Sequence, residues 1–392
     1  MSERYNSRFP AVPMILRLLT LISVAAFLQA LAPTALADAP APPAVAARAW
    51  LLMDTASGQL LTSHNERERV EPASLTKLMT AYLTFAALKT KSLQLSQTVP
   101  VSPRAWKAGG ARMFVEPRKP VTVEELINGM IVQSGNDACI ALAEAVAGSD
   151  EMFAQLMNRE AQRLGMKDTH FVNSTGLPDA KHYSSAYDLA LIATAIIRDF
   201  PEYYHYYSTR EYRYNNITQP NRNRLLWLDP NVDGVKTGHT ENAGYCLIAS
   251  AKRAQWRLLS VVLGTGSENI RAQESQKLLN FGFQLYDNVR LYDSGQPVST
   301  IQVWKGSERT LRAGIPAGLS VTVPKGMAGK LTADLISRQP LLAPVSEGDR
   351  VGTLRVALAD KLVGEYPVVA LQSIATAGMF GRAWDTMRLW FN

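Results

Sequence analysis

Ser74 and Lys77, in the segment Ser-Leu-Thr-Lys, are the first residues of this sequence whose types and spacing could do chemistry. Residues three positions apart lie on the same side of a helix, so the lysine amine would sit beside the serine hydroxyl. A serine hydroxyl is a weak nucleophile that needs a base, and a lysine can be that base if burial and nearby cations lower its pKa. Such a pair arises by accident roughly once in a chain of this length, so alone it equally suits a solvated surface pair.

A second candidate segment is Ser134-Gly135-Asn136. Ser134 could relay a proton to a leaving amine, and Asn136 could bind an amide of the substrate. Taken alone, these residue types favour the simpler interpretation of a helix-capping turn that leads into Asp137.

The third segment is Lys236-Thr237-Gly238, followed by His239. A strand that carries Lys236 and Thr237 toward a cleft could bind a carboxylate, and Gly238 would leave the strand edge open to close approach. The alternative is a plain turn at the start of a strand.

The order and spacing of the three segments make chance an improbable explanation. Ser134 follows Ser74 by 60 residues, and Lys236 follows Ser134 by 102. An ordered triple of this kind is the signature of penicillin-binding proteins and serine β-lactamases. The chain resembles the low-molecular-mass penicillin-binding proteins, the D-alanyl-D-alanine carboxypeptidase family, in the segments SLTK, SGNDAC, VDGVKTGHT, HYSSAYDLA (182–190) and PNRNRLLWL (220–228). Ser-Gly-Asn replaces the Ser-Asp-Asn of the general pattern, and the carboxypeptidases commonly show the former.

The resemblance implies a serine-type D-Ala-D-Ala carboxypeptidase that needs no cofactor and no metal. Its substrate would be the peptidoglycan pentapeptide stem that ends in D-Ala-D-Ala, and β-lactam antibiotics would acylate it. Ser74 would be the nucleophile and Lys77 its general base. Ser134 would relay protons with Lys77 and Lys236, and Lys236 would bind the terminal carboxylate together with Thr237.

Further binding roles follow from the same resemblance. Asn136, Gly238 and His239 would contact the substrate, and the backbone N–H groups of Ser74 and His239 would form the oxyanion hole. Arg271 is a weaker candidate for recognising the carboxylate, and the alternative is that it is a charged residue on a helix surface. The same two interpretations apply to Arg222.

Two other functions compete with this interpretation. A serine β-lactamase would share the fold and the nucleophile, but class A enzymes deacylate with a glutamate, and no Glu-x-x-Leu-Asn segment lies between Ser134 and Lys236. A wall-binding protein with a vestigial site is disfavoured because the candidate catalytic residues are intact.

The sequence pattern around these residues predicts the elements that position them: an α+β domain over 48–286, with strands at both ends and helices between. Strands are indicated at RAWLLMD (48–54), at QLLTSHN (59–65) and in a hairpin formed by 244–251 and 257–264. Helical periodicity indicates a helix from Leu75 to Ala86 and further helices over 123–130, 137–147, 152–164, 185–197 and 268–285.

The pattern changes after this domain. Short alternating segments punctuated by Gly and Pro predict a small all-β domain over 287–372, with strands at VSTIQVW, GLSVTVP, KLTADLI, RVGTLRVAL and EYPVVAL. Residues 376–392 predict an amphipathic helix, with Phe380, Trp384, Met387 and Phe391 on one face. It is too short to span a bilayer, so we expect it to lie on the membrane surface as an anchor, with docking on the β domain as the alternative.

The beginning of the chain predicts export. Residues 1–37 have an arginine-bearing start, an apolar stretch and an Ala35-Leu36-Ala37 cleavage site, as in signal peptides, and a Pro/Ala-rich leader follows over 38–47. The expected location is the periplasmic face of a bacterial inner membrane.

The net charge of the remaining chain is mildly positive. When residues 1–37 are removed, the chain keeps 38 Lys and Arg residues and 33 Asp and Glu residues, a net charge of +5. This mild, unclustered basicity suits an anionic polymer or membrane surface and not nucleic acid. Cys139 and Cys246 are expected to be buried free thiols, with a disulfide between them as the alternative.

Overall fold

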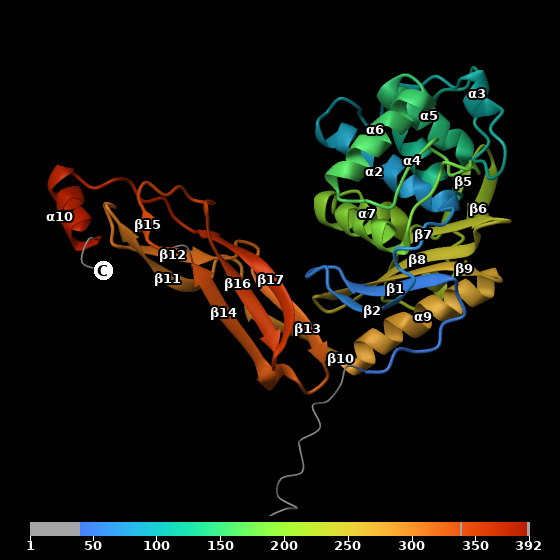
Figure 1. Ribbon diagram of the computed structural model, residues 1–392. Helices are drawn as coiled ribbons and strands as arrows, with labels where there is room; N and C mark the ends of the chain where they lie inside the picture. Colours follow the sequence, from blue (N-terminus) through green and yellow to red (C-terminus); the bar gives the residue numbers. More distant parts are fainter. Residues whose placement is uncertain (1–39, 338, 390–392) are drawn as a thin grey trace, which may run out of the picture. The chain divides into compact units, whose positions relative to one another are not determined.

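The computed structural model describes residues 40–337 and 339–389 (Figure 1). Its first sheet has five antiparallel strands in the order β2-β1-β9-β8-β7. The strands are β1 (Ala49–Asp54), β2 (Leu60–His64), β7 (Val232–Thr240), β8 (Gly244–Arg253) and β9 (Trp256–Thr265). The sheet thus joins the two ends of this part of the chain, as the sequence predicts. Because β7 is the last strand in the order, one of its edges is left unpaired by the sheet.

Helices cover both faces of this sheet (Figure 1). On one face lies α9 (Glu268–Leu285), which Ser267 caps by accepting a hydrogen bond from the backbone N–H of Ile270. A Cβ at Gly282 would run into the side chains of Leu52 and Leu258. A side chain at this position would therefore hold the helix away from the sheet.

The opposite face carries the helices that surround the candidate site. They are α2 (Lys77–Lys89), α4 (Val123–Val132), α5 (Asn136–Ala147), α6 (Asp150–Arg163) and α7 (Ala186–Asp199). Local signals delimit them: Thr122 and Glu125 form a capping box at the start of α4, and Gly148 ends α5 in the left-handed conformation. The predicted helices are present, with ends that differ by one to three residues at most of them.

One helix begins differently from the prediction. Residues Ala73–Thr76 form a 3-10 turn, η1, and α2 starts only at Lys77. Gly176 crosses this turn so closely that a Cβ there would overlap the Ala73 carbonyl. The turn is therefore shaped by a tertiary contact that helical periodicity cannot reveal.

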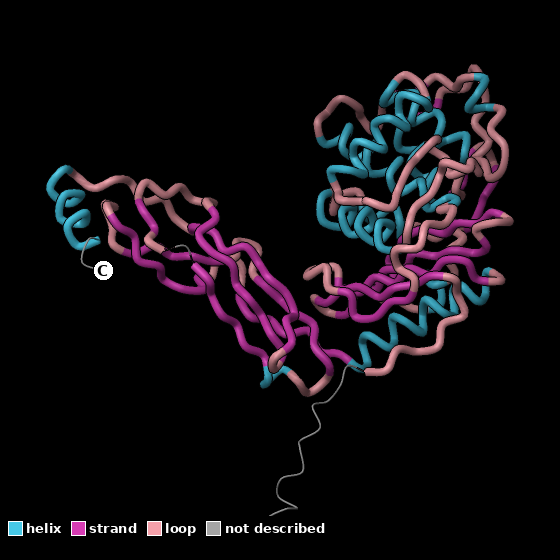
Figure 2. Tube along the Cα trace, in the orientation of Figure 1, coloured by secondary structure: helices cyan, strands magenta, loops and turns pink. Residues whose placement is uncertain are grey.

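Short elements complete this part of the chain. They are α3 (Pro103–Trp106), η2 (Tyr204–Ser208), α8 (Leu225–Leu228), and the two-stranded pairs β3 (Thr98–Val99) with β4 (Val121–Thr122) and β5 (Glu211–Tyr214) with β6 (Ile217–Pro220). The Cα trace in Figure 2 shows that loops make up much of the chain around these short elements.

Between α9 and the C-terminal helix, the chain is built mainly from strands. A pair is formed by β10 (Tyr286–Tyr292) and β13 (Leu319–Pro324), and a six-stranded sheet has the order β14-β16-β17-β12-β11-β15. Its members are β11 (Pro297–Trp304), β12 (Thr310–Gly314), β14 (Leu331–Ser337), β15 (Leu341–Leu342), β16 (Arg350–Leu358) and β17 (Lys361–Ala370). The five predicted strands are present, whereas β10, β12 and β15 were not predicted. This part has its own buried core, which includes Leu311, Val321 and Leu354.

The chain ends in α10 (Met379–Leu389). Its Asp385 carboxylate accepts a hydrogen bond of 2.7 Å from the backbone N–H of Lys305. Met379, Trp384 and Met387 nevertheless have 76%, 53% and 53% of their surface exposed. Phe391, the predicted signal peptide and its cleavage site lie outside the described residues, as does the beginning of the leader. No helix within 40–337 or 339–389 is long and apolar enough to cross a membrane.

Candidate active site

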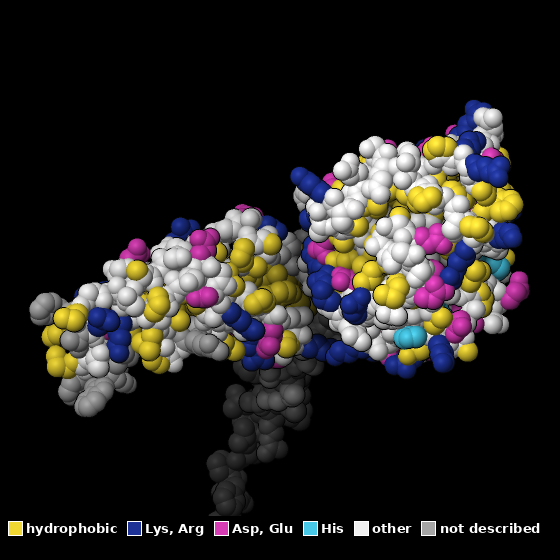
Figure 3. Space-filling model, turned by 90° about the horizontal axis from the view of Figure 1, so that it is seen from above, with side chains coloured by type: hydrophobic (Ala, Val, Ile, Leu, Met, Phe, Trp, Pro, Cys, Tyr) yellow, Lys and Arg dark blue, Asp and Glu magenta, His cyan; other side chains and the backbone are white. Residues whose placement is uncertain are grey.

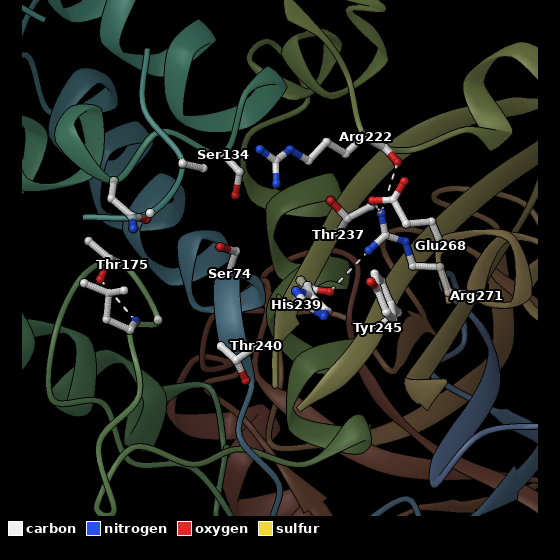
Figure 4. A pocket seen from close by; sticks show the side chains of 16 residues that line it. Ser74, Ser134, Thr175, Arg222, Thr237, His239, Thr240, Tyr245, Glu268 and Arg271 are labelled. Carbon is white, nitrogen blue, oxygen red and sulfur yellow. Dashed lines mark hydrogen bonds and ion pairs between the residues drawn. The ribbon is translucent and has the colours of Figure 1, made fainter. Parts of the chain in front are cut away.

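A cavity of about 340 Å³ opens where η1, the edge strand β7 and the start of α5 meet (Figure 4). This volume lies in the range of small-molecule sites. The cavity is lined by Ser74, Gly110, Ala111, Ser134, Asn136, Thr175, Gly176, Leu177, Arg222, Thr237, Gly238, His239, Thr240, Tyr245, Glu268 and Arg271. The three sequence segments, which lie far apart along the chain, therefore meet at one site.

Ser74 and Lys77 are paired as their spacing predicts. Ser74 lies on η1, half-buried, with its hydroxyl in the cavity, and the Lys77 Nζ is 3.0 Å from its Oγ. Lys77 is the first residue of α2 and only 1% exposed. The surface-pair alternative is therefore wrong.

Two further contacts hold the Lys77 amine. Its Nζ lies 2.7 Å from the Asn136 Oδ1 and 2.6 Å from the backbone oxygen of Thr175. Both oxygens can only accept hydrogen bonds, and a neutral amine has two hydrogens and one lone pair. In the neutral state, both N–H groups are therefore used by these acceptors, and the lone pair is directed at the Ser74 hydroxyl.

Burial favours this neutral state. It lowers the pKa of Lys77 below the ordinary value, and the positive charge of Arg222 lowers this pKa further, partly opposed by Asp137. With this position and a lowered pKa, the amine could act as a general base for Ser74.

The segment Ser134-Gly135-Asn136 does more than cap a helix. Ser134 adopts a left-handed conformation (φ 63°) and lines the cavity, while Asn136 begins α5. The Asn136 side chain bridges the Lys77 amine and the Gly109 carbonyl, to which its Nδ2 donates at 2.7 Å. In this arrangement both amide atoms of Asn136 are engaged by the protein.

Lys236 is buried beside Ser134. It is 3% exposed and does not line the cavity, because its Nζ points to the Ser134 Oγ (2.9 Å) and the Thr237 carbonyl (3.1 Å). Burial lowers its pKa well below the ordinary value, and the charges of Lys77 and Arg222 act in the same direction. The Lys236 amine is thus engaged by Ser134, and its binding of a substrate carboxylate stays a prediction.

The rest of the third segment forms one wall of the cavity. Thr237, Gly238 and His239 follow one another on β7, the edge strand. A Cβ at Gly238 would lie 3.1 Å from the Pro72 carbonyl. Gly238 thus permits close approach, as expected, but the neighbour that approaches is the turn that carries Ser74.

Two arginines and a glutamate lie at one end of the cavity (Figure 4). Arg271 is 2% exposed, so it is not a surface helix charge. Its guanidinium donates to the backbone oxygens of Gly238 and Arg222, both at 3.4 Å, and to Glu268 at 3.1 Å. These contacts tie α9 to the edge strand and place positive charge beside Thr237.

Sequence reasoning missed the loop that closes the site opposite β7. Thr175, Gly176 and Leu177 line the cavity, and the Asn173 side chain holds the loop by accepting from the backbone N–H groups of Thr175 and Gly176. The Asn-Ser-Thr-Gly run is a turn signal, but no motif connects it with Ser74.

A buried carboxylate holds another wall that was not predicted. Asp137 accepts from the backbone N–H groups of Met113 and Phe114, at 2.9 and 2.8 Å, and of Val115. It thereby fixes the segment after Gly110 and Ala111. Cys139 and Cys246 are both buried and free, as expected.

The fold and the paired serine and lysine define the class of serine enzymes that act through an acyl-enzyme. Residues 36–267 match the D-alanyl-D-alanine carboxypeptidase family, and residues 286–376 match the C-terminal domain of penicillin-binding protein 5. The chain belongs to the D-alanyl-D-alanine carboxypeptidase family, a family of serine-type peptidases. The D-alanyl-D-alanine carboxypeptidase DacC of Escherichia coli K12 is 43% identical over 94% of each chain.

Solved structures agree with this assignment. Penicillin-binding protein 5 of Haemophilus influenzae is 38% identical and matches with a TM-score of 0.80 over 86% of this chain and 99% of its own. Penicillin-binding protein D2 of Listeria monocytogenes, determined in an ampicillin-bound form, is 29% identical and matches with a TM-score of 0.58 over 62% of this chain and 100% of its own.

Proposed function

We propose that this enzyme removes the terminal D-alanine from peptidoglycan pentapeptide stems through an acyl-enzyme on Ser74. The observation that carries the proposal is the buried Lys77 amine, whose two N–H groups have acceptors and whose lone pair is left for the Ser74 hydroxyl. Family membership supports the substrate, because the matched family is named for peptides that end in D-Ala-D-Ala.

In acylation, Lys77 takes the proton of Ser74 while the Ser74 oxygen attacks the carbonyl carbon between the two D-alanines. The backbone N–H groups of Ser74 and His239 stabilise the oxyanion. Both residues line the cavity from facing elements, η1 and β7.

The proton must then reach the nitrogen of the departing D-alanine. Ser134 relays it: the Ser134 hydroxyl gives its hydrogen to that nitrogen while its oxygen takes up the proton that Lys77 holds, and the Lys236 amine, 2.9 Å from this oxygen, keeps the hydroxyl in place. Lys236 thus orients the relay. In deacylation, Lys77 activates a water molecule that attacks the acyl carbon and releases Ser74.

The terminal carboxylate binds at the end of the cavity that holds Thr237 and the two arginines. Thr237 supplies the hydroxyl, Arg222 supplies charge toward the cavity, and Arg271 positions the strand through Gly238. The chain of the substrate then leaves past Asn136 and Leu177.

The proposed location is the periplasmic face of the inner membrane. Residues 1–37 act as the signal peptide, and residues 376–392 act as the peripheral anchor. The exposure of Met379, Trp384 and Met387 supports an anchor, since these apolar side chains are available to a lipid interface. The leader 38–47, the catalytic domain 48–286 and the β domain 287–372 lie between. On the face shown in Figure 3, Lys and Arg are interspersed with Asp and Glu, without a single large basic patch.

The lifetime of a penicillin adduct tests this function against a β-lactamase. A carboxypeptidase should keep labelled penicillin on the protein for many minutes and release D-alanine from a pentapeptide. The Ser74→Ala variant should do neither. Rapid turnover of penicillin without D-alanine release would refute the proposal in favour of a β-lactamase.

A further inference from the structure

His182 lies beneath the catalytic turn and has no part in the roles assigned above. It is 2% exposed and does not line the cavity. Its Nε2 is 2.8 Å from the Thr76 Oγ1, and its Nδ1 is 3.1 Å from the backbone nitrogen of Val172. Both ring nitrogens are therefore engaged inside the protein.

The partners determine the tautomer of the ring. A backbone N–H can only donate, so the His182 Nδ1 accepts from Val172, and the hydrogen of a neutral ring lies on Nε2 and is donated to Thr76. Burial lowers the pKa of His182 to about 4, which keeps the ring neutral at ordinary pH.

The two ends of this bridge belong to the catalytic machinery. Thr76 lies between Ser74 and Lys77 in η1. Val172 and His182 are the ends of the 172–182 loop, whose Thr175 carbonyl accepts from the Lys77 amine at 2.6 Å. One imidazole thus joins the turn that carries the nucleophile and base to the loop that holds the base.

The same two segments touch at a second point. A Cβ at Gly176 would overlap the Ala73 carbonyl and lie 2.8 Å from the Thr76 Oγ1. The loop therefore crosses the turn directly over the hydroxyl to which His182 donates. A change in the His182–Thr76 distance would shift the loop relative to Lys77.

We propose that His182 is a positioning residue, whose hydrogen bond to Thr76 locks the 172–182 loop onto the catalytic turn and so aims the Lys77 amine at Ser74. It acts through Thr76 and does not touch the substrate. The inference rests on the proposed role of Lys77 as the base.

Two substitutions separate the ends of the bridge. In His182→Asn, the side-chain oxygen can replace Nδ1 toward Val172, but no atom reaches Thr76. In His182→Gln, the amide nitrogen can replace Nε2 toward Thr76. Misplacing a catalytic group by about 1 Å can cost about 100-fold in rate, so His182→Asn should lower kcat by about 10- to 100-fold, with KM little changed. His182→Gln should restore most of kcat.

Thr76→Val tests the same bond from its other end. It should lower kcat as His182→Asn does, and the double variant should be no slower than the worse single variant, since one bond is lost in each case. His170→Ala is the matched control: this residue of the neighbouring segment bonds the Lys181 carbonyl and does not reach Thr76, so kcat should stay near that of the wild type.

The rate of acylation by labelled penicillin is measured alongside kcat. The acylation rate tests the positioning role independently of the substrate. If the wild type were acylated but released no D-alanine, the proposed substrate would be wrong and the role of His182 could still be measured. Circular dichroism melting identifies variants that are folded. Equal losses in folded His182→Asn and His182→Gln, a wild-type kcat in His182→Asn, or additive losses in the double variant would overturn the proposal.

Discussion

Asn136→Asp is a nearly isosteric change that tests how the base is tuned. It places a carboxylate where the amide oxygen now lies, 2.7 Å from the Lys77 Nζ. An opposite charge within about 4–6 Å typically moves a pKa by about 1 to 3, here upward because the charged ammonium is stabilised. A raised pKa leaves less neutral amine at any pH below it.

The expected result is a loss of acylation at neutral pH that alkaline pH restores. If the pKa of Lys77 rises by 1 to 3, the neutral fraction falls by up to about 10- to 1,000-fold. In the wild type, where burial lowers this pKa, acylation should decline only when the pH falls through the lowered value. The assay is the rate of acylation by labelled penicillin across the pH range in which the protein stays folded.

Asn136→Ala is the matched control. Both substitutions lose the bond from the Asn136 Nδ2 to the Gly109 carbonyl, but only Asn136→Asp adds charge. The Ala variant should therefore lose rate without recovery at high pH. If the Asp variant acylates like the wild type at neutral pH, or shows the pH profile of the Ala variant, a neutral Lys77 is not the base.

Further predictions concern the nucleophile, the relay and the C-terminus. Ser74→Ala should abolish penicillin labelling, and an adduct of penicillin mass on this variant in intact-protein mass spectrometry would disprove the assignment. Lys236→Ala and Ser134→Ala should each slow D-alanine release at least tenfold, since each removes the bond between Lys236 and Ser134, and a hydrogen bond to a charged group is worth roughly 1.5–3 kcal/mol. Their double variant should be about as slow as the slower single one, and additive losses would show that Lys236 acts independently of Ser134. Deleting residues 376–392 should move the enzyme from the membrane fraction to the soluble fraction with its activity on small peptides intact. Retention at the membrane, or a clearly lower melting temperature, would contradict an anchor.

Short motifs were enough to predict which residues meet at the site, but not where their side chains point. The spacing of Ser74 and Lys77 predicts their contact, because both lie within one turn of chain. The direction of the Lys236 side chain depends on Ser134, which is 102 residues earlier, and no local pattern contains it. Thr175 and His182 escaped notice for the same reason, since their partners are reached only through tertiary contacts.

Secondary structure was likewise predicted where local sequence determines it and missed where a distant partner does. The prediction for α9 over 268–285 agrees with the structure because Ser267 is a local N-cap. The short strands β12 and β15 were missed: β15 has only two residues and pairs in parallel with β11, so its existence depends on a distant partner. Periodicity needs several residues to become visible, and two cannot supply it.

The most direct test of the central claim is mass spectrometry of the intact enzyme mixed with a pentapeptide that ends in D-Ala-D-Ala. We predict stoichiometric release of one D-alanine per peptide and, after rapid quenching, a protein species heavier by the tetrapeptide acyl group on the peptide that contains Ser74. D-alanine release with no acyl adduct in the wild type, or an adduct on a peptide without Ser74, would contradict the account.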